Sequence, residues 1–371
     1  MMADDPVFNH LPIALVGPLP PPSGGMANQT RQLARLLQES GLHVELVQVN
    51  SPYRPAWISL IPMVRAIFRL APYLVQLWQV AGRVNLMHVM ANSGWSWHLF
   101  VTPAVWVGWL RRVPIVINYR GGEAEAFFSR AWRWVRPAIV KADLVAVPSG
   151  FLEAIFAQRG IKTEIVPNII DLQCFYPSEV QYELQSHLLV ARNLEPIYDI
   201  ATALKAFALL KKDFPSAKLS VAGSGPLRAN LEQLAIDLGI SDVVTFTGRL
   251  DNRQMAVLYR SANLLLNPSL ADNMPISLLE ALACGVPIVS TNVGGIPYLV
   301  EHERTALLVN PSDDSAMAAA AIRILSDPTL AAALRAAGLA EVQNYTWKKV
   351  RERLFSVYAK VLIDKTIVKR R

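Results

Sequence analysis

The sequence predicts an α/β protein made of two facing, doubly wound parallel-sheet domains with a cleft between them. Three observations support this fold class. Short apolar strands alternate with helix-length segments along nearly the whole chain. The alternation forms two similar series, of which the first runs from about residue 10 to about residue 175. The chain has 371 residues, 52% hydrophobic and 18% charged, which is enough for two cores and excludes a disordered protein.

We place an N-terminal domain at residues 1–178, a C-terminal domain at residues 179–345, and a final helix at residues 346–371 that we expect to pack back on the N-terminal domain. The first domain opens with the strand PIALVG at 12–17, a loop rich in proline and glycine, and an amphipathic helix that ends before Gly41. Its further strands are expected in HVELVQV (43–49), NLMHVM (85–90), VPIVINY (113–119), ADLVAVPS (142–149) and KTEIVPN (162–168).

The loop before the first helix lacks the Gly-x-Gly-x-x-Gly pattern of dinucleotide binding, and the chain has no Gly-Lys-Ser/Thr loop for nucleotide hydrolysis. Neither chemistry is therefore expected here. Instead, Gly24 and Gly25 precede the helix, where their missing side chains let backbone amides approach a phosphate. The same pair also suits a plain turn, so this loop alone does not identify a ligand.

The C-terminal domain repeats the alternation, with strands expected in SHLLVARNL (186–194), AKLSVAG (217–223), VVTFTG (243–248) and NLLLNPS (263–269). It closes with DNMPISLLEALACGVPIVSTNVGGIP at 272–297, in which seven residues separate Asp272 from Glu280. If a helix begins near Pro275, Asp272 lies at its N-terminus and Glu280 lies on its inward face, about two turns further on. A Cys-Gly pair ends this helix and the strand VPIVS follows. Ligands are expected at such helix N-termini and at the carboxyl ends of the strands.

Positive charge and tryptophan gather in one window of the N-terminal domain. The whole chain has a net charge of +7. Between Arg54 and Lys141, eleven basic residues stand against two acids, and eight of the nine tryptophans lie in the same window. Indole rings sit at the headgroup level of a bilayer and cations favour an anionic surface, which indicates attachment to a membrane. The alternative is an aromatic core with a basic cleft for an anionic ligand.

No segment is expected to cross a membrane. The uncharged stretch from Val84 to Leu110 contains an apolar part of only 16 residues, WSWHLFVTPAVWVGWL, and a spanning helix needs about 20. The N-terminus carries two acids and lacks the apolar core of a secretory signal. We therefore expect a cytoplasmic protein that lies peripherally on the inner face of the cell membrane.

These pieces resemble the family 4 glycosyltransferases, which are retaining, metal-independent enzymes of the GT-B fold that take a sugar from a nucleotide diphosphate. The matching motifs are PPPSGGMANQTRQLARLL near the start, VAGSGPLRANLEQLAIDLG (221–239), VTFTGRL (244–250) and SLADNMPISLLEALACGVPIVSTNVGGIPYLV (269–300). The resemblance implies that Asp272 lies near the transferred sugar and that Glu280 accepts hydrogen bonds from the ribose hydroxyls. Without the full motif, these would be two solvated helix acids.

The resemblance implies a larger donor site, in which the backbone from Met274 to Ile276 faces the sugar hydroxyls and the phosphate. The expected donor-binding residues are Gly24, Gly25, Arg192, Tyr198, Gly223, Gly225, Arg249, Asn273, Met274, Pro275, Ile276, Ser277 and Glu280. Asp272, Arg192 and Arg120 are the expected catalytic residues.

The sequence departs from the family pattern at the diphosphate position. The family usually has Gly-Arg-Leu followed by a Lys-Gly pair, whose two cations grip the diphosphate. Here Arg192 is kept in ARNLEP, whereas Tyr198 and Asp199 stand where Lys-Gly is expected. One cation is therefore missing, and "RNLEP" followed by Tyr defines the subgroup that we expect. Arg192 remains a fork for phosphate oxygens, and Tyr198 can donate only one neutral hydrogen bond.

A second departure lies in the N-terminal domain, where the family often has Thr-x-His. Here VINYRGGE places Asn118 at the Thr position and Arg120 at the His position. Arg120 is permanently charged, so it cannot be a general base, but it can hold a phosphate, an anionic sugar or an acceptor. His88 keeps one of two frequent histidines. His88 and Asn118 are possible contacts of the sugar or the acceptor. The alternative, that His88 is a core histidine with its hydrogen bonds satisfied inside the protein, stays open.

We expect a retaining hexosyltransferase that moves a sugar from a UDP- or GDP-linked donor to a glycan or lipid-linked acceptor in cell-surface polysaccharide biosynthesis. It is expected to need no metal and no cofactor, because no Asp-x-Asp stands at a strand end. An anionic membrane surface is an expected partner, and nucleic acid is not. The alternatives are a nucleotide-sugar epimerase of the same fold and a catalytically weak or inactive scaffold subunit.

Overall fold

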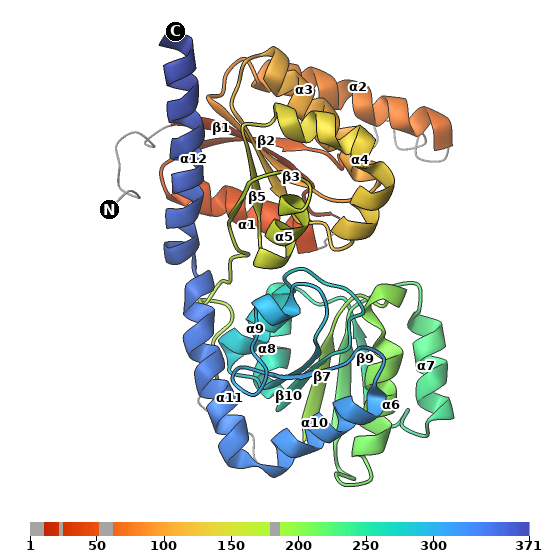
Figure 1. The fold of residues 1–371 in the computed structure, drawn as a ribbon. Coiled ribbons are helices and arrows are strands. Elements are labelled where there is room, and N and C mark those ends of the chain that lie inside the picture. Colours follow the sequence, from red (N-terminus) through yellow and green to blue (C-terminus); the bar gives the residue numbers. More distant parts are fainter. Residues whose placement is uncertain (1–10, 22–24, 52–61, 179–185, 371) are drawn as a thin grey trace. The chain divides into compact units, whose positions relative to one another are not determined.

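The computed structural model describes residues 11–21, 25–51, 62–178 and 186–370. They form two compact units, which are described separately (Figure 1). The N-terminal unit comprises Met1–Asn168 and Val350–Arg371, and the C-terminal unit comprises Ile169–Lys349. We expected the domain boundaries after residues 178 and 345, whereas the chain passes between the units after residues 168 and 349.

In the N-terminal unit the described strands form a six-stranded parallel sheet in the order β2-β1-β3-β4-β5-β6. The strands are β1 (Pro12–Gly17), β2 (His43–Gln48), β3 (Leu86–Ala91), β4 (Ile115–Tyr119), β5 (Leu144–Val147) and β6 (Thr163–Ile165). The helices are α1 (Gly25–Glu39), α2 (Pro62–Val80), α3 (Thr102–Leu110), α4 (Ala124–Lys141), α5 (Gly150–Ala157) and α12 (Trp347–Arg370).

Both faces of this sheet are covered by helices. The chain moves toward one edge between β1 and β2 and toward the other edge from β3 onward. Because such crossovers are right-handed, α1 lies on one face and α2 to α5 lie on the other. Alternate residues of β3 show the two faces. Met87 and Val89 pack in the core with α2 to α5, whereas His88 faces α12 and contacts Tyr358.

The C-terminal unit contains a second six-stranded parallel sheet among its described residues, in the order β12-β11-β10-β7-β8-β9. Its strands are β7 (His187–Ala191), β8 (Lys218–Ala222), β9 (Val244–Gly248), β10 (Leu264–Asn267), β11 (Ile288–Thr291) and β12 (Leu307–Val309). Its helices are α6 (Ile200–Leu210), α7 (Arg228–Asp237), α8 (Asn252–Ser261), α9 (Ile276–Cys284), α10 (Asp314–Ser326) and α11 (Pro328–Glu341). β12 is one strand that the sequence did not predict.

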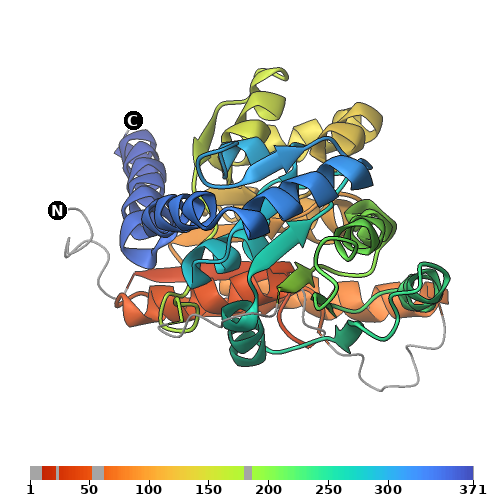
Figure 2. The ribbon, with the colours of Figure 1, turned by 90° about the horizontal axis from the view of Figure 1, so that it is seen from below.

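Two cores lie on opposite faces of the second sheet. Helices α6, α7 and α10 pack on one face, and α10 runs beside α6 in both views (Figure 1, Figure 2). Helices α8 and α9 pack on the other face. Their ends follow the sequence signals: Asp251 and Gln254 form a capping box at the start of α8, and Gly285, with φ of 68°, ends α9. Two doubly wound sheets were expected, and this fold class is confirmed.

The apolar stretch 95–110 divides into a π-helical turn at Trp97–Val101 and α3. Trp97, Ala104 and Val105 are buried, so most of this stretch packs under the first sheet. None of the described helices is by itself both long and apolar enough to cross a membrane, and only the pair Asp314–Ser326 and Pro328–Tyr345, bent by 98°, has the combined length and composition.

The helix α12 is joined to the first sheet by a buried polar contact and a surface ion pair. The Tyr358 hydroxyl lies 2.8 Å from Nδ1 of His88, and both side chains are fully buried. Nζ of Lys360 lies 2.6 Å from the Glu164 carboxylate at the surface. The exposed pair contributes little, whereas the buried contact satisfies a polar group that has no access to water.

We predict that Tyr358→Phe destabilises the N-terminal unit by about 1–3 kcal/mol, because it leaves a buried ring nitrogen of His88 without its partner. Scanning calorimetry of the full chain measures this as a lower unfolding midpoint. Tyr298→Phe is the matched control, since Tyr298 is 57% exposed on the C-terminal unit. Equal midpoints for Tyr358→Phe and the parent would show that the contact does not stabilise the unit.

Candidate active site

The carboxyl edge of the second sheet gathers most of the polar residues that the sequence singled out. Parallel strands end at a common edge, so the loops after β7, β8, β10 and β11 meet there. Arg192 follows β7, and Gly223 follows β8. Asp272 follows β10 in the loop that enters α9. Backbone topology alone therefore brings residues 80 positions apart to one place.

The Arg192 guanidinium is the centre of this edge. Its Nε donates to Oδ1 of Asn267 at 3.0 Å and to Oγ of Ser269 at 3.2 Å. Its Nη2 donates to Oγ of Ser269 at 3.2 Å and forms an ion pair with Asp272. The Arg192 side chain is only 11% exposed, and burial lowers its pKa. Its Nη1 makes no hydrogen bond to any of the described residues and remains available to a ligand.

The Tyr198 ring, rather than its hydroxyl, contacts Arg192. The guanidinium carbon lies 4.6 Å from the ring centroid, a stacking geometry that holds the guanidinium plane. The next residue, Asp199, adopts φ of 42°, in the left-handed region that favours glycine. Its carboxylate accepts a hydrogen bond from Thr202 at 2.7 Å in the first turn of α6. Asp199 thus fills a glycine-like backbone position, and Tyr198 supports the remaining cation.

Four glycines fix the loops around Arg192 and Asp272. A Cβ on Gly223 or Gly225 would collide with the backbone of residues 192–194. A Cβ on Gly294 or Gly295 would collide with the backbone of residues 272–273, and the Gly295 amide donates to the Asp272 carbonyl at 2.8 Å. The close approach of two backbones requires glycine at these positions. The four glycines therefore position both members of the ion pair.

The N-terminus of α9 lies directly after Asp272. Asn273 and Met274 are buried, Pro275 is the N-cap with φ of −64°, and Ile276 is the first helical residue. Oγ of Ser277 is buried and makes no hydrogen bond within the described part of the chain. The first amides of a helix have no intrahelical acceptor and carry partial positive charge. A helix N-terminus beside a buried hydroxyl suits an anion.

Glu280 lies on the second turn of α9 and is partly buried. Loss of hydration raises its pKa to about 7, although a hydrogen bond with Tyr259 and the charge of Arg192 act in the opposite direction. The Tyr259 hydroxyl also lies 3.1 Å from the Ser277 carbonyl, which ties α8 to α9. Near neutral pH the Glu280 carboxyl is therefore present both as a carboxylate, which only accepts hydrogen bonds, and as a protonated acid, which can also donate one.

Arg249 is the second cation of this edge. It follows β9, where Gly248 adopts φ of 72°, and its side chain is exposed. Among the residues that the structure describes, Arg249 has neither a hydrogen bond nor an ion pair. It is therefore free to move toward a charged ligand, in contrast to Arg192.

The N-terminal unit places Arg120 at the carboxyl end of β4. Its Nε donates to Oδ1 of Asn118 at 3.0 Å, and its Nη1 donates to Oε1 of Gln29 at 2.7 Å and to Oδ1 of Asn168. Burial lowers the pKa of Arg120 to about 10, so it stays charged at neutral pH. Gly25 is exposed at the start of α1, and Gly24 lies outside the described residues.

Asn118 and His88 form a chain of hydrogen bonds that leads from Arg120 into the core. Because Oδ1 of Asn118 accepts from Arg120, its Nδ2 faces Nε2 of His88 at 3.0 Å and donates to it. Nδ1 of His88 therefore carries the proton and donates to the Tyr358 hydroxyl. Burial, and then the charge of Arg120, lower the pKa of His88 to about 3. His88 and Asn118 have no exposed surface, and their polar atoms contact each other, Arg120 and Tyr358. Their contact with a sugar or an acceptor stays a prediction.

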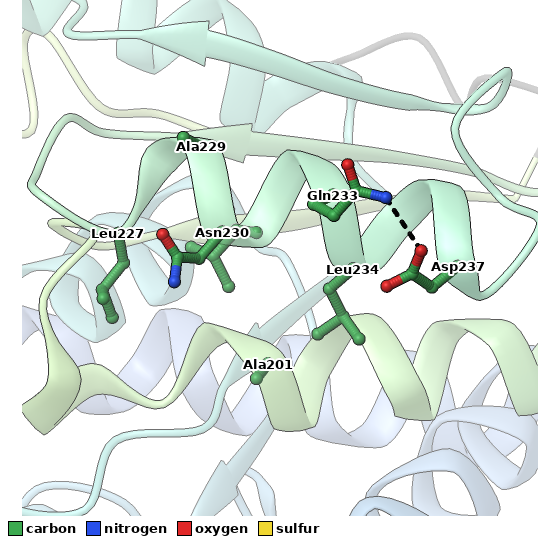
Figure 3. Close-up of a pocket in the computed structure, with 8 residues that line it drawn as sticks. Ala201, Leu227, Ala229, Asn230, Gln233, Leu234 and Asp237 are labelled. Atoms are coloured by element: carbon green, nitrogen blue, oxygen red, sulfur yellow. Dashed lines mark hydrogen bonds between the residues drawn. The ribbon is translucent and has the colours of Figure 1, made fainter.

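The described part of the chain shows no metal-binding cluster, and its groove between α6 and α7 is lined by residues other than the predicted site residues. Residues 11–21, 25–51, 62–178 and 186–370 contain no group of three or more His, Cys, Asp or Glu side chains arranged to hold a metal ion. A shallow groove runs between α6 and α7, where Gln233 donates to Asp237 at 2.9 Å (Figure 3). None of the predicted site residues lines this groove.

Comparison with known proteins identifies both halves of the chain. Residues 23–173 match the family described as Glycosyltransferase Family 4, and residues 178–340 match the family described as Glycosyl transferases group 1. The chain therefore carries the two domains of a glycosyltransferase. It is 27% identical to the N-acetyl-alpha-D-glucosaminyl L-malate synthase of Bacillus anthracis, over 84% of this chain and 87% of that protein.

Solved structures with the same fold cover nearly the whole chain. The sucrose-phosphate synthase of Thermosynechococcus elongatus has a TM-score of 0.74 at 23% identity, over 95% of this chain and 100% of that one. HepE from Anabaena in complex with UDP-glucose has a TM-score of 0.73 at 18% identity, over 95% and 100% of the two chains. The two sheets therefore form the GT-B fold of this glycosyltransferase.

Sequence reasoning missed several residues that contact those of the candidate site. Asn267, Ser269 and Tyr259 hold Arg192 and α9, and Gln29 and Asn168 hold Arg120. A signal was present in NLLLNPS, where polar residues end an apolar strand at the ligand-binding edge. Nothing local in the sequence indicated Tyr259, which lies on the buried side of an ordinary amphipathic helix.

We predict that Glu280→Gln removes a pH dependence of stability. The raised pKa means that the folded chain binds this proton more tightly than the unfolded chain does. The contribution of Glu280 therefore falls as pH rises from about 4.5 to about 7 and stays low above that value. At about pH 8, Glu280→Gln is expected to be more stable than the parent by on the order of 1–2 kcal/mol.

Scanning calorimetry across this pH range is the measurement. Asp242→Asn is the control, because Asp242 is exposed on the same unit. If Glu280→Gln and the parent lose stability in parallel as pH rises, Glu280 is not the group that titrates.

Proposed function

We propose that this glycosyltransferase binds a UDP- or GDP-linked sugar on its C-terminal unit and transfers the sugar with retention of configuration. The observation that carries the proposal is the juxtaposition at the second sheet's carboxyl edge. Arg192 is held by Ser269 and Asp272 with Nη1 left for a ligand. The α9 N-terminus and the unpartnered Ser277 hydroxyl follow in the same loop and helix. A diphosphate is an anion that fits a charged guanidinium N–H group beside a helix N-terminus.

The relatives support a nucleotide sugar as the donor. HepE from Anabaena was crystallised with UDP-glucose. The Bacillus anthracis relative is named for an N-acetylglucosaminyl group, which is a sugar. In our proposal, Glu280 accepts hydrogen bonds from the ribose hydroxyls through an ionised carboxylate. Because its pKa is raised to about 7, donor binding is expected to strengthen as pH rises through that value. Asp272 orients Arg192 and lies beside the transferred sugar.

The proposed transfer needs no residue of the chain as a nucleophile. The bond between the anomeric carbon and the diphosphate oxygen breaks, and the acceptor hydroxyl forms the new bond on the same face of the sugar. The acceptor proton passes to the departing phosphate oxygen. Negative charge thus develops on the diphosphate, where Arg192, Arg249 and the α9 amides stabilise it without a metal ion.

The proposed acceptor is a glycan or a lipid-linked glycan in cell-surface polysaccharide biosynthesis, used at the inner face of the cell membrane. Arg120 favours an acceptor that carries a negative charge, such as a phosphate or a carboxylate, because its guanidinium is charged and lies at the strand carboxyl edge of its unit. A small organic acid is a second candidate acceptor, which the L-malate in the name of the Bacillus anthracis relative favours.

We predict that UDP or GDP stabilises the chain against thermal unfolding, by about 2.7 kcal/mol at roughly 100 times the dissociation constant. Arg192→Ala is expected to lose this stabilisation, and Arg192→Lys to keep part of it. Arg228→Ala is the matched control, because Arg228 lies on the same unit and is 46% exposed. A nucleotide diphosphate that stabilises Arg192→Ala as well as the parent would remove Arg192 from the site.

Activity tests the remaining parts of the proposal. With a nucleotide sugar and a membrane extract as the source of acceptor, we expect transfer with retention, and full activity in the presence of EDTA. Loss of activity with EDTA and its return with magnesium or manganese would contradict metal independence. Inverted product, or a free epimer of the donor without any transfer, would contradict retaining glycosyl transfer.

A further inference from the structure

The C-terminal ends of α2, α3 and α4 carry exposed apolar side chains, which are unusual on helices that face water. We define the tryptophan face as Leu74, Val75 and Trp78 of α2, Trp109 and Leu110 at the end of α3, and Val140 of α4. These side chains are all exposed, with Trp78 at 48%, Leu110 at 59% and Val140 at 57%. On a solvent-exposed helix the outward positions are normally polar.

The tryptophan face is continuous and basic. The Arg111 guanidinium lies 4.8 Å from the ring centroid of Trp78, and Nζ of Lys141 lies 4.0 Å from the ring centroid of Trp109. These two contacts join α2 to α3 and α3 to α4. Arg112 is exposed beside them. Three cations and two indole rings therefore lie at the ends of three neighbouring helices.

Acidic residues are few around the tryptophan face in the sequence. From residue 62 to residue 141 the chain contains only Glu123 and Glu125 as acids. Both lie at the opposite end of α4 from Lys141, since Glu123 is the N-cap and Glu125 is in the first turn. Asp143, two residues beyond Lys141, is exposed and accepts a hydrogen bond from the Ile115 amide. The three cations of the tryptophan face therefore outnumber the acids close to them in the sequence.

The tryptophan face and Arg120 lie at opposite edges of the N-terminal unit. Helices of right-handed crossovers run antiparallel to the strands that they connect. The C-terminal ends of α2, α3 and α4 thus lie at the amino edge of the sheet, whereas Arg120 follows the carboxyl end of β4. A partner on the tryptophan face leaves the ligand edge of the same unit accessible.

We propose that the tryptophan face binds an anionic lipid bilayer. Indole rings partition to the headgroup level, and each cation near the surface adds about 1 kcal/mol of attraction to anionic lipid. A second copy of the chain is a poor occupant, because two such faces would bring six cations together against only the two copies of Asp143. This partner goes beyond the donor chemistry and does not depend on it.

Sedimentation with vesicles of equimolar phosphatidylglycerol and phosphatidylcholine tests the proposal with the full chain. At low salt we expect the parent to sediment with these vesicles, to stay in the supernatant with pure phosphatidylcholine, and to be released at about 1 M salt, where the screening length is about 3 Å. The triple variant Arg111→Glu, Arg112→Glu, Lys141→Glu is expected to bind these vesicles at least about a hundredfold more weakly than the parent. Lys205→Glu with Lys212→Glu, both exposed on the C-terminal unit, is the matched charge control.

A second pair of variants tests the indole contribution. Trp78→Gln with Trp109→Gln is expected to weaken vesicle binding at least tenfold, whereas Ile236→Gln with Val257→Gln, which are 57% and 59% exposed on the other unit, leaves it unchanged. A parent that stays in the supernatant at low salt overturns the proposal. So does equal binding by all variants, and so does a dimer in sedimentation velocity that the tryptophan variant abolishes. Each result is separate from donor binding, which is measured by UDP or GDP stabilisation of the same variants.

Discussion

The buried guanidinium of Arg192 is the constraint on which the carboxyl edge of the C-terminal unit depends. A cation that leaves water is costly unless protein groups replace its hydration. Here an aromatic ring, an amide, a hydroxyl and a carboxylate do so, supplied by Tyr198, Asn267, Ser269 and Asp272. These groups come from different strands and loops. The Arg192 guanidinium therefore has all of its partners only when this edge of the sheet is folded.

The N-terminal unit uses a related arrangement with a different electrostatic result. Three side-chain amide oxygens, from Gln29, Asn118 and Asn168, accept hydrogen bonds from Arg120. These acceptors are neutral, whereas Arg192 is paired with a carboxylate. Amide acceptors orient a guanidinium without cancelling its charge, which suits a residue proposed to attract an anionic acceptor. The Asn118 amide also fixes the His88 tautomer, so the core beneath Arg120 is ordered by the same cation.

The sequence predicted the sheets well, because each buried strand is a short apolar run between helix-length segments, and β1 agrees with its predicted bounds. The roles of single residues were harder to predict. From the sequence, Tyr198 could offer only one neutral hydrogen bond where a lysine is usual, whereas in the structure its ring stacks on Arg192, a contact that depends on a turn and a glycine-like Asp199. Asn267 lies 75 residues from Arg192, and only strand order reveals that they meet. Spacing rules describe neighbours on one element and do not describe such contacts.

The central claim is that Arg192 holds the outer phosphate of a nucleotide diphosphate. Titration calorimetry with UDP against UMP, and with GDP against GMP, tests it most directly in the parent and in Arg192→Ala. A charge-assisted hydrogen bond is worth roughly 1.5–3 kcal/mol, so the parent should prefer the diphosphate by about tenfold or more. Arg192→Ala should bind the monophosphate nearly as the parent does and lose most of that preference. If the variant weakens both nucleotides equally, or keeps the preference, the guanidinium supports the fold of this edge and does not grip the diphosphate.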